Sequence, residues 1–406
     1  MVCEAWEDLY FQDVVNYIKS GISENQNKEG KGFPVTRIET ISDGTVNYEK
    51  VGYLETDKNI DNHLLDAGDI LFSNINSIKH IGKIALYNGE QTLYHGMNLL
   101  RIKLERKKID IKFGYYLLCS QPSVDYFQAN AKQAINQASL NQKDILGMPI
   151  KLPPLYEQRK IAAILTSVDN AIVKTDAIIK QTEKVKAALM QQLLMKGIGH
   201  TEFKQTEIGK IPVEWDVLSI AECCEILDNM RVPLSKKVRE TIKGNIPYYG
   251  ATGIVDYINK YLYDFEVVLI GEDGDHFNKY RDWSMTSLVN GKSWVNNHAH
   301  VMRAKEMLTN EWLHRFLEHR DITRYLAIQG ATRLKLTQQS LRKIPIAIPP
   351  LNEQESITKV IHSVENKINI EKEKLTRYQV IKRGLMQSLL TGNIRVNIDE
   401  KTEVII

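Results

Sequence analysis

Three short stretches of this chain contain residue types that hold phosphates or metal ions in other proteins. Gly291–Ser293 (GKS) ends like a phosphate-binding P-loop but lacks the glycine that the pattern requires five residues earlier. Gly271–Asp275 (GEDGD) begins like a calcium loop, yet the next alternate ligand position is a phenylalanine. His298 and His300 would share one face of a strand, but without a third ligand they fit groove contacts or ordinary strand histidines better. We therefore predict neither a catalytic centre nor a metal site.

A different chemistry is indicated by loops that combine amides with cations. They lie at Phe72–His80, Gln128–Gln137, Asn229–Arg239, Tyr248–Thr252 and Gly330–Lys335. Asn and Gln can pair with adenine edges and Arg or Lys with guanine edges in the major groove, while Lys, Ser and Thr can hold phosphates. For any single residue the alternative is an ordinary polar loop. Taken together, the loops favour contact with DNA.

The residues that we expect to contact DNA are Asn74, Asn76, Lys79, His80, Lys132, Gln133, Arg231, Lys236, Lys237, Tyr249, Thr252, Lys292, Arg333 and Lys335. Among them, Lys79 and Lys132 should serve the first half of the chain, and Arg333 and Lys335 the second.

Composition sets wide bounds on the class of protein. The net charge of +3 neither demands nor excludes nucleic acid, because a basic face can lie within a nearly neutral total. None of the four cysteines forms a CxxC pair, which is typical of reduced thiols in the cytosol. The N-terminal segment is acidic, and no apolar run approaches the ~18 residues that span a bilayer. We expect a cytoplasmic protein without a membrane partner.

One stretch of the chain occurs twice. Ile150–Gln158 (IKLPPLYEQ) returns 196 residues later as Ile346–Gln354 (IAIPPLNEQ). The same offset holds without a gap to Leu189–Leu194 (LMQQLL), which matches Leu385–Leu390 (LMQSLL). The sequence between the copies barely resembles the sequence before the first copy. A similar scaffold with dissimilar inserts indicates two recognition heads on one frame.

The repeated stretches are predicted to be long helices. Ile161, Leu165, Val168 and Ile172 are spaced by 4, 3 and 4 residues, and the second copy repeats these intervals from Ile357. This spacing places a narrow apolar seam along one side of a helix, as in a coiled coil. Each helix would cover about 40 residues, or about 60 Å. Two such helices should pair, and an antiparallel pair would hold the inserts at opposite ends.

Both inserts have the pattern of mixed helix and sheet. In the first, strands are predicted at Asp69–Ser73, Gly82–Tyr87 and Asn98–Lys103, and a helix at Phe113–Gln121. In the second, strands are predicted at Val267–Ile270, Ser293–Asn296 and Ala299–Met302, and a helix at Trp312–Tyr325. The two inserts also start alike, at Trp6 and Trp215, so we expect related heads that differ in their loops.

These features divide the chain into five parts. We predict a first head over residues 1–152, a central long helix over 153–200, a second head over 201–348, a distal long helix over 349–392 and a tail over 393–406. Glycines at 197, 199 and 392 supply the helix stops. The tail takes the place that Thr201–Val213 takes after the first helix, and we expect it to pack on the first head and close a pseudo-twofold ring.

The repeated Pro-Pro-Leu-x-Glu-Gln, the long helix after it and the Leu-Met-Gln-x-Leu-Leu ending resemble the DNA-specificity (S) subunit of type I restriction-modification systems. Glu207–Trp215 (EIGKIPVEW) and Ile246–Gly253 (IPYYGATG) carry the same resemblance, which covers nearly the whole chain. It implies an α+β fold with two globular target recognition domains, separated by two long antiparallel coiled-coil helices and related by a pseudo-twofold internal repeat. Pro153, Pro154, Glu157 and Gln158, with Pro349, Pro350, Glu353 and Gln354, match the scaffold pattern of that family.

The resemblance also implies a function. Each head would read one half of a bipartite, asymmetric double-stranded DNA site, and the helices would fix the spacer and dock two modification (methyltransferase) subunits. Those subunits would use S-adenosylmethionine to methylate adenine, and restriction subunits would add a nuclease that depends on ATP and Mg²⁺. This chain itself would hold no cofactor and would not be an enzyme.

Two alternatives remain open from the sequence. The chain could be the specificity subunit of another restriction-methylase class, in which the heads and helices recruit a different catalytic chain. It could also be a coiled-coil scaffold that binds only protein. Salt-dependent DNA binding by the assembled complex would favour a specificity subunit, and its absence would favour the scaffold that binds only protein.

Overall fold

The structure, a computed structural model, describes residues 5–42, 44–135, 137–329 and 333–396. The chain forms two compact units. The first unit joins the residues up to Asp176 to those from Glu373 onward, and the second unit is Ala177–Lys372. Among the described residues, no helix combines the length and the apolarity that crossing a lipid bilayer requires.

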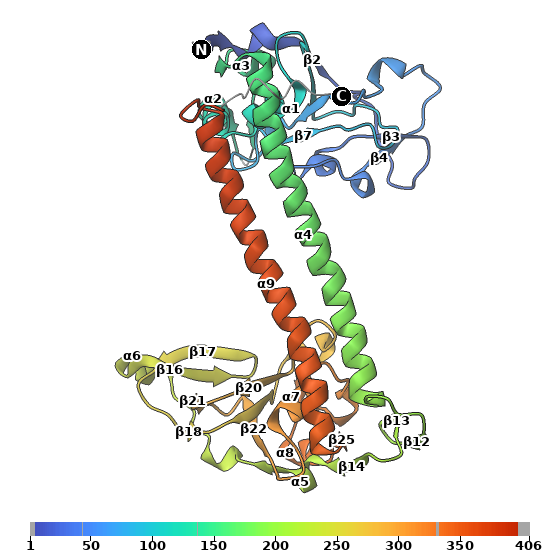
Figure 1. The fold of residues 1–406 in the computed structure, drawn as a ribbon, viewed down its shortest axis with the longest axis vertical. Coiled ribbons are helices and arrows are strands. Elements are labelled where there is room, and N and C mark those ends of the chain that lie inside the picture. The colour runs from blue at the N-terminus through green and yellow to red at the C-terminus, as the bar shows by residue number, and fades with distance from the viewer. Residues whose placement is uncertain (1–4, 43, 136, 330–332, 397–406) are drawn as a thin grey trace. The chain divides into compact units, whose positions relative to one another are not determined.

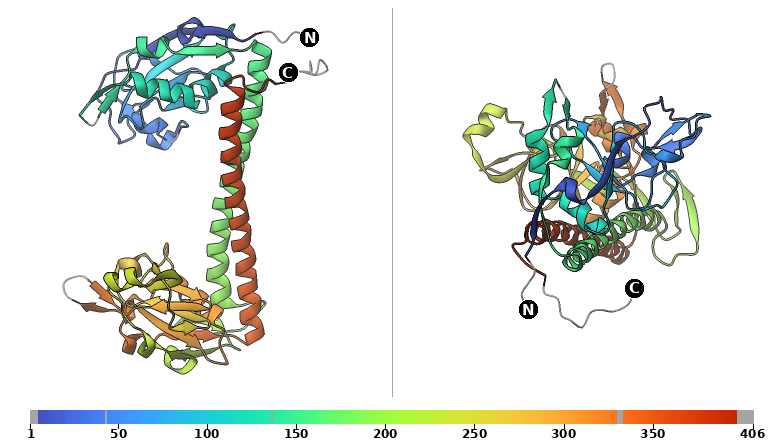
Figure 2. Two further views of the ribbon diagram at one scale, coloured as in Figure 1. Left: turned by 90° about the vertical axis from the view of Figure 1, so that its left-hand side faces the viewer. Right: turned by 90° about the horizontal axis from the view of Figure 1, so that it is seen from above.

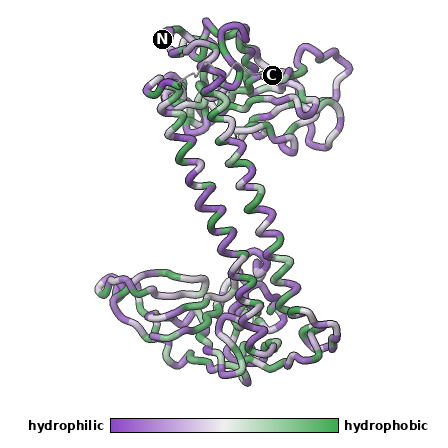
Figure 3. The backbone as a smooth tube through the Cα atoms, viewed as in Figure 1, coloured by the Kyte–Doolittle hydropathy of each residue, from purple (hydrophilic) through white to green (hydrophobic). Residues whose placement is uncertain are grey.

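Two long helices supply one half each to both units. They are α4 (Leu155–Lys196) and α9 (Leu351–Leu389), close to the predicted lengths (Figure 1). Within each unit the two half-helices run side by side and antiparallel (Figure 2). Apolar positions recur along both helices (Figure 3), and Ile161, Leu165, Ile357 and Ile361 are almost fully buried. The predicted antiparallel helices with apolar seams are confirmed.

The first head is built on a four-stranded antiparallel sheet of order β2-β8-β5-β7. Its strands are β2 (Val15–Ser20), β5 (Ile70–Phe72), β7 (Ile84–Leu86) and β8 (Leu100–Leu104). Smaller ladders are β1 (Glu7–Tyr10) with β11 (Pro149–Leu152), β3 (Phe33–Val35) with β4 (Gly52–Leu54), and β6 (Ile75–Asn76) with β10 (Gln137–Ser139) and β9 (Lys132–Ala134). The helices are α1 (Ile111–Leu118), α2 (Gln121–Asn130) and α3 (Gln142–Leu146).

The second head repeats this plan with more strands. Its main sheet has the order β15-β22-β19-β20, from Cys224–Ile226, Ala299–Ala304, Val267–Gly271 and Thr286–Val289. A second sheet has the order β17-β16-β21-β18, from Gly253–Ile258, Lys243–Gly250, Lys292–Val295 and Tyr263–Asp264. Two-stranded ladders are β12 (Phe203–Thr206) with β13 (Gly209–Pro212), β14 (Asp216–Ser219) with β25 (Pro345–Ile348), and β23 (Ala327–Gln329) with β24 (Arg333–Lys335). The helices are α5 (Ile220–Cys223), α6 (Lys236–Thr241), α7 (Asn310–Glu318) and α8 (Gln338–Leu341).

Two sequence predictions need correction. The helix expected at Trp312–Tyr325 ends at Glu318, because the chain turns there and Ile322 enters the core beside the helix. The carbonyl of Glu318 accepts instead from the backbone N–H of Met285 at 3.0 Å. His298 precedes β22 rather than lying in it, so it does not share a strand face with His300. The mixed helix and sheet class is confirmed in both heads.

The repeated glutamate ties the start of each head to the start of a long helix. In the first unit, the indole N–H of Trp6 donates to Glu157 Oε2 at 3.2 Å. In the second, Trp215 donates to Glu353 Oε2 at 2.9 Å. Because the strand just after each tryptophan pairs with the strand just before the long helix, as β1–β11 and β14–β25, the glutamate closes the head into a loop.

The repeated glutamine holds the first turn of a head helix. Gln158 Nε2 donates to the carbonyls of Pro153 and Lys108, and its Oε1 accepts from the backbone N–H of Asp110 at 2.8 Å. Asp110 is the N-cap of α1. We call Glu157 with Gln158, and Glu353 with Gln354, the Glu–Gln latches.

The second latch repeats these contacts. Gln354 Nε2 donates to the carbonyls of Pro349 and Met307, and its Oε1 accepts from Thr309, the N-cap of α7, at 2.9 Å. Two heads with mostly different sequences therefore have a glutamine at the same place that makes the same three bonds. The repeated Pro-Pro-Leu-x-Glu-Gln of the sequence is therefore the part of the chain that attaches each head to its long helix.

Each long helix is followed by a glycine that lies against the tryptophan bonded to the repeated glutamate. Gly197 follows α4 with φ +64°, and a Cβ there would lie 2.3 Å from Glu353 Oε1 and 2.8 Å from the Trp215 ring. Gly392 follows α9 with φ +74° and lies against the Trp6 ring. L side chains rarely adopt this conformation, so glycine is needed at both places.

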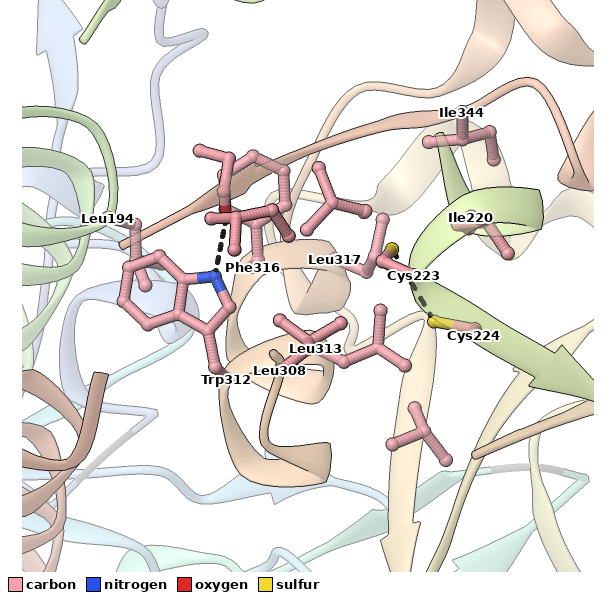
Figure 4. Packing of buried hydrophobic residues seen from close by; sticks show 14 of the residues in the cluster. Leu194, Ile220, Cys223, Cys224, Leu308, Trp312, Leu313, Phe316, Leu317 and Ile344 are labelled. Carbon is pink, nitrogen blue, oxygen red and sulfur yellow. Dashed lines mark hydrogen bonds between the residues drawn. The ribbon is translucent and has the colours of Figure 1, made fainter. Parts of the chain in front are cut away.

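The core of the second head is centred on α7. Trp312 donates its indole N–H to the carbonyl of Ala347 at 2.8 Å, and Leu313, Leu317 and Cys223 belong to the same buried cluster (Figure 4). Cys223 and Cys224 are both buried, with their sulfurs 3.7 Å apart. The same core takes in Leu193 and Leu194 of α4, so the helix end is part of the head rather than an attachment to it.

The second latch gives a direct test of this arrangement. Gln354→Ala should lower the unfolding free energy of the second unit by about 1–3 kcal/mol, because the backbone groups of Met307, Thr309 and Pro349 lose the buried glutamine that they bond to. Urea unfolding followed by tryptophan fluorescence measures the change. Gln192→Ala, at an exposed position of α4, is the control and should have little effect. An equal response of the two variants would contradict the latch.

Candidate nucleic-acid interface

The structure brings the two predicted DNA loops of the first head together. Strand β6, from the first loop, pairs with β10, and β10 pairs with β9 from the second loop. Lys132 and Gln133 lie exposed on β9, and Lys79 and His80 lie exposed in the turn that follows β6. Four of the predicted residues thus lie on the β9–β10 hairpin and its neighbouring loop.

The two predicted asparagines of this loop have structural bonds. Asn74 Nδ2 donates to the carbonyl of Leu140 at 3.2 Å. Asn76 Nδ2 donates to Ser73 Oγ, and its Oδ1 accepts from the backbone N–H of Ser77 at 2.8 Å. Both side chains are half-buried. They position the loop, and Lys79 and His80 are the side chains that it presents to solvent.

The second head has a hairpin at the equivalent place. Strands β9 and β10 precede α3 in the first head, and β23 and β24 precede α8 in the second. With the 196-residue offset, the β10 positions coincide with those of β24. Arg333 lies on β24 opposite Gln329. The Arg333 side chain and the loop residues 330–332 lie outside the described part of the chain.

Two other predicted cations of the second head converge on one carboxylate. Arg231 Nη1 lies 2.8 Å from Glu272 Oε2, and Lys335 Nζ lies 3.2 Å from Glu272 Oε1. Arg231 also donates to the carbonyl of Ala299 at 2.8 Å. The backbone N–H of Leu336 donates to the Glu272 carbonyl, so this cluster fastens the β24 end of the hairpin to the main sheet.

His300 forms the buried part of the same cluster. Its Nδ1 lies 2.6 Å from Asp228 Oδ2 and its Nε2 lies 2.8 Å from the carbonyl oxygen of Leu336. The ring therefore lies between the Asp228 carboxylate and the backbone that follows β24. Burial would raise the pKa of Asp228, but the bond to His300 and further donors outweigh it and hold that pKa below its ordinary value. His300 therefore anchors the hairpin.

The remaining predicted residues lie around the β16–β17 hairpin. Lys236 and Lys237 are exposed on α6, and Thr252 is exposed in the β16–β17 turn. Tyr249 on β16 is half-buried. Lys292 Nζ lies 4.8 Å from the centre of the Tyr261 ring, a cation–π contact.

Sequence reasoning missed several residues of this hairpin. Arg239 lies 2.9 Å from Asp256 across the hairpin and fixes α6 to β17. Tyr257 and Tyr261 are about half exposed and add aromatic surface beside the lysines. Three tyrosines and one lysine between residues 257 and 263 were the available signal, but nothing in the sequence showed which of them reach solvent. Among the described residues, no cluster of three or more His, Cys, Asp or Glu side chains could hold a metal ion.

A polar network also lies in the core of the first head. Arg101 on β8 is buried, with Nη2 2.6 Å from Asp69. His95 is buried beside this strand, and its Nε2 lies 3.0 Å from the carbonyl of Leu99. Burial lowers the pKa of His95 to about 4, and the Arg101 charge adds to that effect. The folded head therefore favours the neutral ring.

Comparison with known proteins decides the family. The model of the type I restriction modification DNA specificity domain matches residues 4–184 and 212–379, once for each head with its helix. The chain belongs to this family. Its members give a type I restriction-modification complex its DNA sequence specificity, so this chain is a specificity (S) subunit rather than the catalyst.

Relatives match over the whole length of this S subunit or over part of it. A putative type I restriction enzyme MjaX specificity subunit from Methanocaldococcus jannaschii is 34% identical and covers 97% of this chain and 94% of its own length. The EcoKI specificity subunit of Escherichia coli is 28% identical over 47% of this chain and 42% of its own length.

Solved structures agree in fold. An S subunit from M. genitalium aligns with a TM-score of 0.58 at 15% identity, covering 96% of both chains. A chain from a structural study of complex assembly and conformational transition in the type I R-M system aligns with a TM-score of 0.59 at 15% identity, covering 97% of this chain and all of that one. S subunits assemble with other restriction-modification subunits and bind DNA.

The Glu272 cluster predicts that Arg231 acts mainly through stability. Arg231→Met should destabilise the second unit by about 3 kcal/mol, because Glu272 loses a partly buried partner and the Ala299 carbonyl loses its donor. Lys210→Met, at an exposed lysine of β13 that is not among the proposed DNA contacts, is the matched control. Chemical unfolding and DNA affinity should be measured together. Wild-type stability with weak DNA binding would instead identify Arg231 as a direct DNA contact.

His95 predicts a pH dependence of the first unit. Its folded pKa of about 4 lies below the ordinary 6.5, so the unfolded chain binds more protons between these values. Stability should therefore be full above pH 6.5 and fall by roughly 3 kcal/mol as the pH drops towards 4. His95→Gln should remove this part of the pH dependence while keeping a donor for Leu99. Urea unfolding over that pH range measures it, and an unchanged slope would contradict the prediction.

Proposed function

We propose that each head of this S subunit reads one half of a bipartite, asymmetric site in double-stranded DNA. The observation that carries the proposal is the pair of equivalent hairpins, β9–β10 and β23–β24. Each lies at the same distance before its long helix, and each sits on a head that otherwise differs in sequence and loops. Two hairpins at equivalent positions, on heads whose loops differ, suit the recognition of two different half-sites.

The DNA-contacting side chains that we propose divide by what the structure shows of them. Lys79, His80, Lys132, Gln133, Lys236, Lys237, Thr252 and Lys292 are exposed and suit direct contact. Asn74, Asn76, Arg231 and Lys335 have partners within the head and suit a positioning role. Arg333 and Tyr249 complete the proposal. Lysines would hold phosphates, while amides and arginine would read base edges.

The long helices would fix the spacer and dock two modification subunits. Large apolar side chains project from them into solvent: Val173, Val380 and Ile381 in the first unit, and Ile178, Val185 and Ile370 in the second. Exposed apolar positions on helices that are already paired favour a protein partner. That partner would carry S-adenosylmethionine and methylate adenine. Restriction subunits with ATP and Mg²⁺ would complete a nuclease.

The parts of the chain follow the same proposal. The heads would be residues 1–152 and 201–348, the helices 153–200 and 349–392, and the tail 393–406. Arg395 of the tail reaches Glu157 through two charge-assisted bonds of 2.8 and 2.7 Å, and Val396 packs beside the first core. These contacts support a tail that closes on the first head; residues 397–406 lie outside the described part of the chain.

A map of methylated adenines tests the proposal. Cells that express this chain with its cognate modification subunit should show one asymmetric two-part motif with a fixed gap, lost when this chain is deleted. A gap that places the half-sites about one helical turn apart, ~34 Å, would put both heads on one face of the duplex. Methylation that persists without this chain, with the complex intact, would favour a scaffold that binds only protein.

The exposed lysines of the first head give a prediction specific to one half-site. Lys79→Ala with Lys132→Ala should weaken DNA binding by the methylase complex and reduce the slope of log affinity against log salt by about 2, near 0.9 for each lost phosphate contact. Base substitutions in the DNA half-site that the second head reads should lower the affinity of the variant complex and of the wild-type complex by the same factor. Lys107→Ala, an exposed lysine elsewhere in the first head, is the control. An unchanged salt slope would remove both lysines from the interface.

A further inference from the structure

A carboxylate on each long helix holds two other elements at once. In the first unit this is Asp169 on α4. The hydroxyl of Tyr116, on α1 of the head, donates to Asp169 Oδ2 at 2.8 Å. Lys382 Nζ, on α9, lies 2.6 Å from Asp169 Oδ1. The carboxylate therefore joins the head helix, its own helix and the neighbouring long helix at a single point.

The second unit repeats this arrangement with the roles of the long helices exchanged. Glu365 is now on α9, and Arg315 of α7 forms a two-pronged ion pair with it at 2.8 and 2.6 Å. Lys186 Nζ, on α4, lies 2.6 Å from Glu365 Oε1. Asp169 and Glu365 are 196 residues apart, and so are Lys186 and Lys382. We call the two triads the acid clamps.

The clamps differ in their charge. Tyr116 is a neutral donor, whereas Arg315 is buried among Glu311, Glu318 and Glu365. Burial would raise the pKa of Glu365, but Lys186 and Arg315 outweigh it and hold that pKa below its ordinary value. Tyr116 and Arg315 are chemically different, yet each binds the acid of the long helix at the same place in its head. The attachment at this place therefore matters more than the type of residue that makes it.

The clamp and the latch together hold one head helix at two points. Gln158 binds Asp110, the N-cap of α1, and Asp169 binds Tyr116, six residues further along the same helix. In the second unit Gln354 binds Thr309 and Glu365 binds Arg315, again six residues on. The two attachments are 11 residues apart on each long helix, about 16 Å at 1.5 Å per residue. One attachment would let the head pivot about the latch; two attachments set its angle.

We propose that Asp169 and Glu365 are positioning residues that set the angle of each head on the helix pair and so limit the bipartite site to one spacer length. This rests on the proposed function, because the spacer has meaning only if both heads read DNA. A head that pivots about its latch carries its hairpin along the helix axis. The half-site sequence would stay the same, since no reading residue is changed, while neighbouring gaps would become acceptable.

The test is the map of methylated adenines for variants of the full complex. Glu365→Ala and Asp169→Ala should each keep both half-site sequences but methylate sites with a gap one base longer or shorter, at a level at least tenfold above the wild type. Glu365→Asp and Asp169→Glu keep the carboxylate and should largely restore the single gap. Glu183→Ala is the matched control, because Glu183 pairs with Lys372 between the two long helices at 2.8 Å. It should keep the wild-type gap.

A milder variant covers the case in which the alanine proteins fold poorly. Tyr116→Phe removes only the hydroxyl that Asp169 accepts from and keeps the packing of the ring. It should widen the accepted gap in the same way as Asp169→Ala. A single wild-type gap in Tyr116→Phe and in a folded Glu365→Ala complex would overturn the proposal, and so would a changed half-site sequence.

The result for the wild-type complex distinguishes a failure of the acid-clamp proposal from a failure of the proposed function. A wild-type complex without any two-part motif would show that the proposed function fails, and the clamp proposal would fall with it. A wild-type complex with a fixed gap, together with variants that keep that gap, would overturn the clamp alone.

Discussion

The bond between a buried glutamate at the start of each long helix and the tryptophan at the start of each head is the constraint on which the rest depends. Glu157 is almost fully buried, and both Trp6 and Arg395 donate to its carboxylate. Glu353 collects Trp215, the backbone of Ile198 and His200 in the same way. A buried carboxylate is stable only when donors surround it, so the chain must bring three distant segments to this point. The head is closed as a result.

The adjacent glutamine extends that constraint into the head. It bonds to the N-cap of a head helix, and the free backbone groups at a helix start make such a bond valuable. Because Gln158 and Gln354 bond to backbone groups at equivalent positions, the two heads are attached to their helices in the same way despite unlike loops. Within this chain the loops of the two heads therefore differ while the attachment to the long helix is the same.

The loops are themselves held by buried polar clusters rather than by apolar packing alone. Glu272, His300 and Asp228 fasten one end of the β23–β24 hairpin, and Asn74 fastens the loop beside β9–β10. Side chains that look like DNA contacts in the sequence thus divide into two groups. Some face solvent, as Lys79 and Lys132 do, and others hold the surface in shape, as Arg231 does. Preorganised loops lose less entropy on binding, which favours selective recognition.

The sequence by itself determined the repeat, the two long helices with their seams, the glycine stops and the α+β character of the heads. These follow from local periodicity and backbone preferences, which a single chain displays directly. Only the tertiary structure decided which partners the charged and amide side chains have. Glu157 with Trp6, Asp169 with Tyr116 and Arg231 with Glu272 are separated by 41 to 151 residues. Periodicity indicates which face of a helix is buried, but the partner across that face is set by how distant elements pack.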